Sequence, residues 1–242
     1  MQRSTSPRVI LFDIETSPNL GWTWRKWEDN VIKFSQEWQL LSLAYKELGK
    51  PKTFCIARPD FKDKTEKSLV KAAWKILDEA DVVIAHNGDQ FDVKKLRAKF
   101  VEHGLPPTRP FKSIDTKKIA KSQFSFNSNS LNDLAFTLKL GAKKQTGGID
   151  LWFECMDGNR AAWHKMKAYN RHDVILLEKV YDRLKAWYPN HPNFALYADR
   201  PGCPVCSSMR VQRRGYQILK LRKTGRFQCQ GCAHWFNRAV PA

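Results

Sequence analysis

The chain has 242 residues, 42% of them hydrophobic, which is enough to bury one sizeable core and to carry a small accessory module. Its 42 Lys and Arg against 24 Asp and Glu give a formal net charge of +18, which favours nucleic acid as a partner, although a basic proteome would shift the charge the same way. No apolar run approaches the ~20 residues of a membrane span and no signal-peptide core follows Met1, so we expect no membrane partner and a cytoplasmic location.

The first predicted strand is followed by two carboxylates. Its apolar, partly β-branched run Val-Ile-Leu-Phe predicts a buried strand over residues 8–13, and Glu15 comes two residues after Asp13. Because residues i and i+2 of a strand point to the same face, these two side chains can hold one ion together. An acidic pair after an apolar run is also common where a strand closes or a helix is capped, so this motif alone does not define a catalytic site.

A Trp-rich stretch follows the first strand. Bases of a single strand stack on exposed aromatic rings while Lys and Arg hold the phosphates, so this stretch suits a groove for a 3′ end. Packing in the core or anchoring of a loop is the alternative role for each tryptophan. The residues concerned are Trp22, Trp24, Trp27 and Trp38, interleaved with Arg25 and Lys26.

The middle of the chain alternates strands with helices. Asp92 lies near the start of a predicted helix, directly after Phe91. It can serve a metal site or simply open the helix, and Asp115 poses the same choice at the next helix. The predicted elements are strands over 40–48, 53–57, 82–85 and 111–114 and helices over 64–79 and 91–103, the second helix being stopped by Gly-Leu-Pro-Pro.

Three later helices complete the predicted order. In the last of them Tyr169 and Asp173 are four residues apart and therefore share a face. A solvated helix face with a core tyrosine would show the same spacing. The predicted helices cover 116–122, 131–140 and 160–187, and residues 141–158 are predicted to be a flexible loop at the mouth of the site.

The three acidic motifs gain meaning from their order along the chain. A strand with Asp-x-Glu, a second strand that leads to an Asp, and a late helix with Tyr-x-x-x-Asp together predict one catalytic site. Oxygen-rich clusters suit Mg²⁺ or Mn²⁺, and two ions ~3.5–4 Å apart stabilise the attacking and leaving oxygens of a phosphoryl displacement. The predicted catalytic residues are Asp13, Glu15, Asp92, Tyr169 and Asp173, whose four carboxylates are the predicted ligands of two catalytic ions.

Four of the six cysteines form two Cys-x-x-Cys pairs near the C-terminus. Such pairs on a hairpin make a tetrahedral thiolate site, which selects one structural Zn²⁺. Disulfides are the alternative in an oxidising compartment, and a redox role would need a pair that opens a helix after a strand. The predicted zinc ligands are Cys203, Cys206, Cys229 and Cys232, and the predicted hairpin has strands over 215–221 and 226–228 with a turn at Thr224 and Gly225.

The C-terminal tail is strongly basic. Residues 200–242 hold nine Lys and Arg and no Asp or Glu. We expect the tail to bind phosphates of nucleic acid, or alternatively to dock a replication or repair protein. Several prolines precede it, so the predicted organisation is a catalytic domain over 1–188, a linker over 189–202 and a zinc module over 203–242.

The three acidic motifs resemble the exonuclease motifs of the DnaQ-like, or DEDD, 3′–5′ exonuclease superfamily, and the tail resembles a zinc ribbon. The resemblance covers residues 8–187 and is to the tyrosine type, because Tyr169 stands four residues before Asp173. His172 is adjacent to that aspartate and would point about 100° away from it on a helix. The resemblance implies an α/β, ribonuclease H-like fold with a mixed central sheet.

The resemblance also implies roles for the site residues. Asp13, Glu15 and Asp173 would hold one ion. Asp13 with Asp92 would hold the second, and Tyr169 would orient the attacking water.

A closer similarity is to small stand-alone relatives of the proofreading domain of family B DNA polymerases, which are frequent in bacteria and their viruses. It is carried by the segments DIETSPNLGWTWRKWEDNV and SLNDLAFTLKLG. The expected location is therefore a bacterial nucleoid or a phage-infected cell. The expected activity is metal-dependent 3′–5′ hydrolysis of single-stranded DNA with release of 5′-nucleotides. A structure-specific endonuclease and a catalytically inactive nucleic-acid-binding factor are the alternatives, and the complete set of carboxylates disfavours the second.

Overall fold

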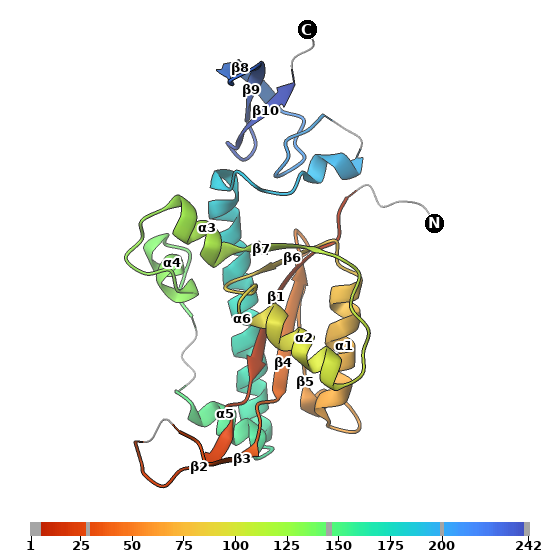
Figure 1. Cartoon of the computed structure of the whole chain (residues 1–242), viewed down its shortest axis with the longest axis vertical. Coiled ribbons are helices and arrows are strands. Elements are labelled where there is room, and N and C mark those ends of the chain that lie inside the picture. Colours follow the sequence, from red (N-terminus) through yellow and green to blue (C-terminus); the bar gives the residue numbers. More distant parts are fainter. Residues whose placement is uncertain (1–5, 28–29, 144–146, 199–200, 240–242) are drawn as a thin grey trace.

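The computed structural model describes residues 6–27, 30–143, 147–198 and 201–239 and has a mixed α/β architecture (Figure 1). A five-stranded sheet with the order β5-β4-β1-β6-β7 lies at its centre. The first three strands of this order are antiparallel and β1, β6 and β7 are parallel, so the predicted mixed sheet is confirmed. The strands are β1 (Val9–Thr16), β4 (Leu40–Glu47), β5 (Thr53–Ala57), β6 (Val82–Ala85) and β7 (Lys112–Asp115).

Helices cover both faces of the sheet, and strand β1 is apolar on both faces for that reason. Val9 and Leu11 pack against α3, α4 and α6, whereas Ile10 and Phe12 pack against α1 and α2. Continuation of the first row along β1 directs residues 13 and 15 toward α6. The helices are α1 (Glu66–Asp78), α2 (Asp92–Glu102), α3 (Thr116–Gln123), α4 (Leu131–Thr137), α5 (Asp150–Met156) and α6 (Arg160–Leu184).

The ends of two predicted helices are wrong. Helix α4 ends at Thr137 rather than at residue 140, because Lys139 adopts a left-handed φ of 56° and the Leu140 N–H turns back to the carbonyl of Ala135. Helix α6 ends at Leu184 and continues only as a 3₁₀ turn.

Among the described helices, none has the combination of length and apolar character that crossing a membrane requires.

The predicted loop over 141–158 contains a helix. Helix α5 buries Leu151 and Cys155 against Trp163 and Met166 of α6, and this packing stabilises an element too short to be recognised by its periodicity. Residues 144–146 of the predicted loop lie outside the described part of the chain.

The Trp-rich stretch forms a two-stranded ribbon, β2 (Leu20–Trp22) with β3 (Lys33–Gln36), at the end of the molecule opposite the C-terminal module (Figure 1). Trp22, Trp24 and Trp27 are 67%, 85% and 89% exposed. Trp38 instead lies under the ammonium groups of Lys95 and Lys99, 3.8 and 4.3 Å from its ring centroid. The three rings thus expose much of their surface, and substrate contact at the ribbon stays a prediction.

The C-terminal module is a three-stranded sheet with the order β10-β9-β8. The first strand of the predicted hairpin begins at residue 211 instead of 215, and the second ends at residue 229 instead of 228. The turn spans residues 219–222 instead of 224 and 225, and there the Leu219 N–H donates to the carbonyl of Arg222. A third strand was not predicted. The strands are β8 (Val211–Ile218), β9 (Lys223–Cys229) and β10 (Trp235–Ala239).

The segment predicted as a linker packs against α6. The Tyr181 hydroxyl lies 2.7 Å from Nε2 of His191, and Phe194 is buried in the core cluster of the main sheet. Within the module, His234 Nδ1 lies 2.8 Å from the carbonyl oxygen of Ala186, just beyond α6. These contacts fix the position of the module relative to α6.

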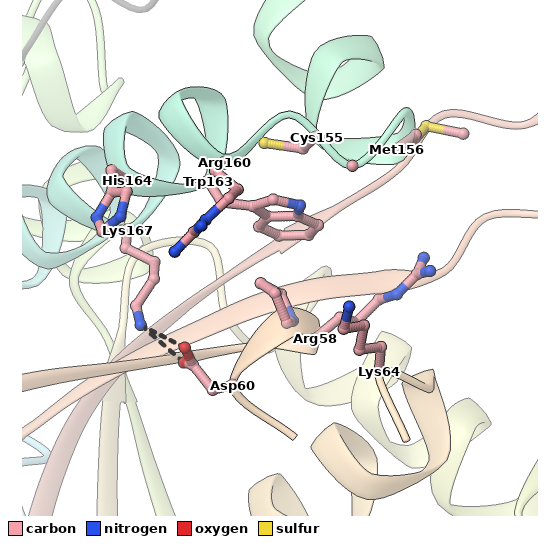
Figure 2. A pocket seen from close by; sticks show the side chains of 11 residues that line it. Arg58, Asp60, Lys64, Cys155, Met156, Arg160, Trp163, His164 and Lys167 are labelled. Atoms are coloured by element: carbon pink, nitrogen blue, oxygen red, sulfur yellow. Dashed lines mark hydrogen bonds and ion pairs between the residues drawn. The ribbon is translucent and has the colours of Figure 1, made fainter. Parts of the chain in front are cut away.

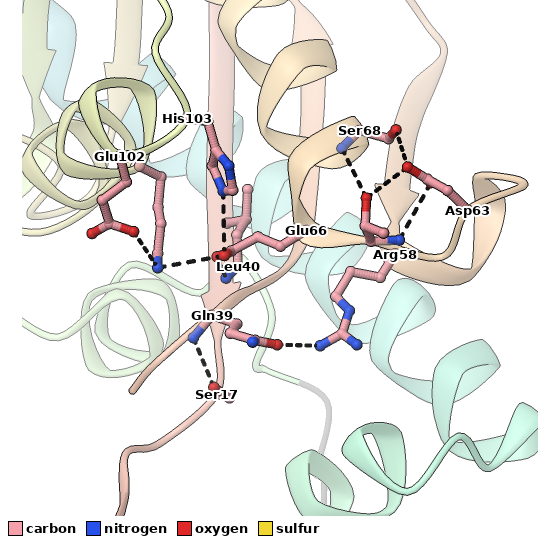
Figure 3. A network of polar contacts seen from close by, with 11 residues as sticks. Ser17, Gln39, Leu40, Arg58, Asp63, Glu66, Ser68, Glu102 and His103 are labelled. Atoms are coloured by element: carbon pink, nitrogen blue, oxygen red, sulfur yellow. Dashed lines mark hydrogen bonds and ion pairs between the residues drawn. The ribbon is translucent and has the colours of Figure 1, made fainter. Parts of the chain in front are cut away.

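A polar network joins β4, α1 and α2 on the other side of the sheet (Figure 3). Glu66, in the first turn of α1, accepts the backbone N–H of Leu40 at 2.5 Å and lies 3.4 Å from the ammonium of Lys99 on α2. His103 Nε2 lies 3.5 Å from the same carboxylate. Because Lys99 is buried, removal of Glu66 would leave its charge with Glu102 as the one acidic partner among the described residues. The network thereby holds the helix that begins at Asp92 in place.

Candidate active site

Strand β1 presents the first two carboxylates. Its antiparallel pairing with β4 continues past Asp13 and Glu15, whereas its parallel pairing with β6 ends at Leu11. The two acidic residues therefore lie beyond the last pair with β6, on the row that faces α6. This position leaves one side of β1 free of a neighbouring strand at the site.

Helix α6 brings the third carboxylate. Its buried face carries Asn170 and Asp173 within an otherwise mainly apolar stripe, and Asp173 is 1% exposed. Carboxylate oxygens of Asp13, Glu15 and Asp173 all lie within 4.8 Å of one another. Three hard oxygen donors at that separation have the donor chemistry that Mg²⁺ or Mn²⁺ requires.

Asp92 reaches the site from the segment that follows β6, on the side of β1 away from β4. It is the first residue of α2, and its Oδ1 accepts the backbone N–H of Ile14 at 3.2 Å, so the carboxylate lies beside β1 but outside the set of three. The turn before it needs glycine at position 88, because a Cβ there would lie 2.4 Å from the Cβ of Ala85. Asp115 holds the same turn through the N–H of Asn87 at 2.9 Å.

Asp115 is therefore a cap rather than a member of the cluster. Its side chain accepts the N–H groups of Lys117 and Lys118 at the start of α3, which was the structural alternative at this position. His172 turns away from the cluster, with Nε2 2.9 Å from the carbonyl oxygen of Ala142.

Burial of several carboxylates at one place makes their ionised forms unfavourable. Burial, followed by the charges of Asp92, Glu15 and Asp173, raises the pKa of Asp13 well above its usual value. Burial and the charge of Asp173 raise the pKa of Glu15 to about 8. Burial also raises the pKa of Asp92 to about 7, although the hydrogen bond that it accepts from the N–H of Ile14 acts to lower that pKa. A divalent cation would relieve this repulsion, so the electrostatics of the site fit a metal.

An unpartnered oxygen gives the same indication. Oδ1 of Asp173 is buried and has no hydrogen-bond partner among the described residues. Such an atom is costly unless a ligand satisfies it. Both the repulsion between the buried carboxylates and the unpartnered oxygen are therefore those expected of a site that binds a cation through oxygen atoms.

Lys143 is part of the site and was not predicted. Its ammonium forms an ion pair with Oδ2 of Asp173 and lies 3.2 Å from the hydroxyl of Tyr169. The residue lies in the loop after α4, 30 positions before Asp173, and no spacing rule connects the two. The only signal in the sequence is the Lys-rich character of that loop.

Asn170 was also missed. Its Nδ2 donates to Oδ2 of Asp13 at 2.7 Å, and its Oδ1 accepts from the hydroxyl of Ser42 at 3.1 Å. The amide thus fixes the orientation of the Asp13 carboxylate. The i, i+3 spacing of Asn170 and Asp173 on one helix face could have pointed to it.

Tyr169 lies at the edge of the cluster as predicted from its spacing to Asp173. Burial and the Asp173 charge raise the pKa of its phenol to about 12, so the hydroxyl keeps its proton at neutral pH. Its ring packs edge-on against Trp152 of α5, with 6.2 Å between ring centroids. Helix α5 therefore helps to hold the phenol in place.

Removal of divalent ions should make the folded protein less stable as the pH rises. The raised pKa values mean that Glu15 and Asp92 stay protonated in the folded chain but ionise in the unfolded chain above about pH 4. The stability that these two protonated carboxyl groups contribute to the folded chain is complete below about pH 4. It is lost as the pH rises through their folded pKa values of about 7 and about 8. One pKa unit corresponds to about 1.4 kcal/mol, so the free energy of unfolding should change by several kcal/mol.

Thermal unfolding at pH 5 and pH 8, with zinc retained and Mg²⁺ absent or present, measures this effect. Asp92→Asn should raise the Tm of the Mg²⁺-free protein at pH 8, whereas Glu154→Gln on the exposed face of α5 serves as the matched control. An equal response of the two variants would contradict the prediction.

The four C-terminal thiols converge. One sulfur from each cysteine lies within 4.8 Å of the others, with 3.7 Å between Cys203 and Cys232 and 3.6 Å between Cys206 and Cys229. Hydrogen bonds from the N–H groups of Cys232 and Gly231 lower the pKa of Cys229 to about 7, although burial acts in the opposite direction. Four clustered thiols with N–H···S contacts are compatible with a zinc ribbon.

A separate cavity of about 530 Å³ lies between the turn after β5 and the start of α6 (Figure 2). The described residues that line it include Arg58, Lys64, Arg160 and Lys167 but none of the four predicted carboxylate ligands. Lys167 forms two contacts of 2.7 and 2.8 Å with Asp60 across it. The candidate chemistry therefore lies in the carboxylate cluster and not in this cavity.

The chain is similar to a known family. A family model for the RNase H superfamily matches residues 34–185. The match spans more than half of the chain and includes Asp92, Tyr169 and Asp173, while Asp13 and Glu15 lie before its first residue. No curated protein matches the chain.

Proposed function

Because this chain belongs to the RNase H superfamily, we propose that it is a metal-dependent 3′–5′ exonuclease that releases 5′-nucleotides from single-stranded DNA. Members of the superfamily are usually nucleases or hydrolases that use divalent metals. Within it we place the chain among the DnaQ-like enzymes of the tyrosine type, near relatives of the family B proofreading domain. The observation that carries the proposal is the convergence of Asp13, Glu15 and Asp173 with Asp92 beside them.

The four carboxylates have distinct roles in the proposal. Asp13, Glu15 and Asp173 would hold one divalent ion, and Asp13 with Asp92 would hold a second. When bound, such ions polarise the scissile phosphate and stabilise the attacking and leaving oxygens. Asn170 donates to Oδ2 of Asp13 and so would hold that carboxylate in one orientation for such ions.

The remaining residues act on water and on substrate charge. The protonated hydroxyl of Tyr169 can donate to or accept from a water beside Asp173, and so orients it. The ammonium of Lys143 contacts both the phenol and that aspartate, and at this position it would attract a phosphate oxygen of the substrate. We further propose a catalytic domain over residues 1–188, a packed connection over 189–202 and a zinc ribbon over 203–242.

A test of this function compares two 5′-labelled single-stranded DNA 20-mers, one with a free 3′ hydroxyl and one with a blocked 3′ end. We expect the free substrate to shorten stepwise in Mg²⁺ or Mn²⁺ and the blocked one to resist. Equal internal cleavage of both would support a structure-specific endonuclease instead. Binding without cleavage of either would support a catalytically inactive binding factor, and a parallel RNA 20-mer identifies the preferred sugar.

A further inference from the structure

One face of the C-terminal sheet carries a pocket of about 460 Å³. Paired residues of adjacent strands point to the same side, which places Trp235 with Gln228, and Asn237 with Arg226. The side chain of Asn237 also donates to that of Gln217 on β8. We call this feature the Trp235 pocket and define it by Gln217, Arg226, Trp235 and Asn237, all of which line it.

The side chains of the Trp235 pocket match the parts of a nucleotide. The indole of Trp235 is 48% exposed and offers a flat apolar surface for a base. The two carboxamides offer donors and acceptors to the edge of a base, and the guanidinium of Arg226 is a permanent cation for a phosphate. One nitrogen of that guanidinium donates to the Tyr216 carbonyl at 3.1 Å, which fixes the group at the rim.

The charge of the module selects the kind of partner. Residues 201–242 contain eight Lys and Arg and no Asp or Glu, and even the loss of two charges on zinc binding would leave the module cationic. In the same module, Arg213 and Lys223 lie 4.4 and 5.0 Å from the ring of Tyr216, which also lines the pocket. Aromatic rings among cations and no anions suit a single nucleic-acid strand, which needs both stacking and neutralisation of phosphates.

The pocket lies at a fixed distance from the carboxylate cluster along α6. The contact of His234 with Ala186 anchors the residue next to Trp235 at the end of that helix. Thirteen positions separate Asp173 from Ala186, and at ~1.5 Å per residue this corresponds to about 20 Å. Phosphates of a helical strand are spaced by ~3.4 Å, so a strand that leaves the cluster can reach the module within about six nucleotides.

We propose that the Trp235 pocket binds an upstream nucleotide of a single-stranded nucleic acid whose 3′ end lies at the carboxylate cluster. This inference rests on the proposed exonuclease function for the position of the 3′ end. The presence of the pocket and its preference for a single strand rest on the module alone. The fixed connection makes the contact dependent on the length of the strand.

The test measures binding of oligothymidylate to the full-length protein with Asp13→Asn, so that no substrate is consumed. Stacking contributes ~1–3 kcal/mol per base, so Trp235→Ala should weaken binding of a 20-mer about 5- to 150-fold, and Trp235→Phe should restore most of it. A trimer, which is too short to occupy the cluster and the pocket together, should lose less affinity in Trp235→Ala than the 20-mer does. Leu221→Ala removes a 93% exposed side chain of the same module outside the pocket and should leave the 20-mer Kd unchanged.

Zinc analysis of each variant shows that the module is intact. Wild-type affinity of Trp235→Ala for the 20-mer would overturn the pocket, and equal losses for the 20-mer and the trimer would overturn the placement of the 3′ end at the carboxylate cluster. These outcomes are independent of the end-blocking experiment, which tests the hydrolytic function of the Asp13-containing protein. If Trp235→Ala loses affinity for the 20-mer while the protein with Asp13 cleaves DNA internally, the pocket proposal stands and the exonuclease proposal is rejected.

Discussion

Replacement of Asp13 by Asn should lower the turnover of phosphodiester hydrolysis by ~100-fold or more. Asp13 is the carboxylate that the proposal assigns to both ions, and catalysis at such sites is almost entirely electrostatic. The amide keeps the size of the side chain and removes its charge. Because burial and three neighbouring carboxylates disfavour that charge, Asp13→Asn should also stabilise the Mg²⁺-free protein at neutral pH.

The measurement is single-turnover hydrolysis of the 5′-labelled 20-mer, with Tm recorded for each protein. Tyr169→Phe should cause a smaller loss, because the ring keeps its packing against Trp152 and only the hydroxyl contact is removed. Asp157→Asn, at an exposed position after α5, is the matched control and should retain the wild-type rate. Turnover of Asp13→Asn within a few-fold of wild type would reject the carboxylate cluster as the active site.

Replacement of Cys203 by Ser should abolish tight zinc binding and unfold the C-terminal module. Structural zinc contributes ~10–16 kcal/mol in small modules, far more than the few buried apolar side chains around these thiols can supply. The wild-type chain should hold about one Zn²⁺ after dialysis, and the variant much less. Metal analysis measures the stoichiometry, and limited proteolysis measures the loss of structure after residue 201.

Cys155→Ser is the matched control for this result. Cys155 is a buried cysteine outside the cluster, packed between α5 and α6, so its replacement should leave the zinc content unchanged. Full zinc occupancy in Cys203→Ser, or equal zinc loss in both variants, would show that the four thiols do not form the predicted site.

The parts of the site that could be predicted lie in local patterns. The period of two along β1 placed Asp13 and Glu15 on one face, and the period of the helix placed Tyr169 with Asp173. The structure brings these residues together as those patterns require. The mixed sheet was implied by the resemblance of the three acidic motifs to those of the DnaQ-like superfamily, and the structure confirms it.

The parts that could not be predicted depend on contacts between distant segments. Asn170 reaches Asp13 across 157 positions, and Lys143 reaches Asp173 from a loop without regular spacing. Helix α5 was missed because seven residues give too little periodicity, and its stability comes from packing on α6. Short elements and long-range polar contacts are set by tertiary packing, which a single sequence does not display.

The crossing of α6 over β1 has a consequence for the newly made chain. Glu15 and Asp173 are separated by 158 positions, so at 5–20 residues per second the ribosome needs roughly 8–30 s to add Asp173 after Glu15. During that time the emerging polypeptide holds an incomplete set of ligands. The proposed active site should therefore form only after α6 has been synthesised and docks onto a sheet that is already present.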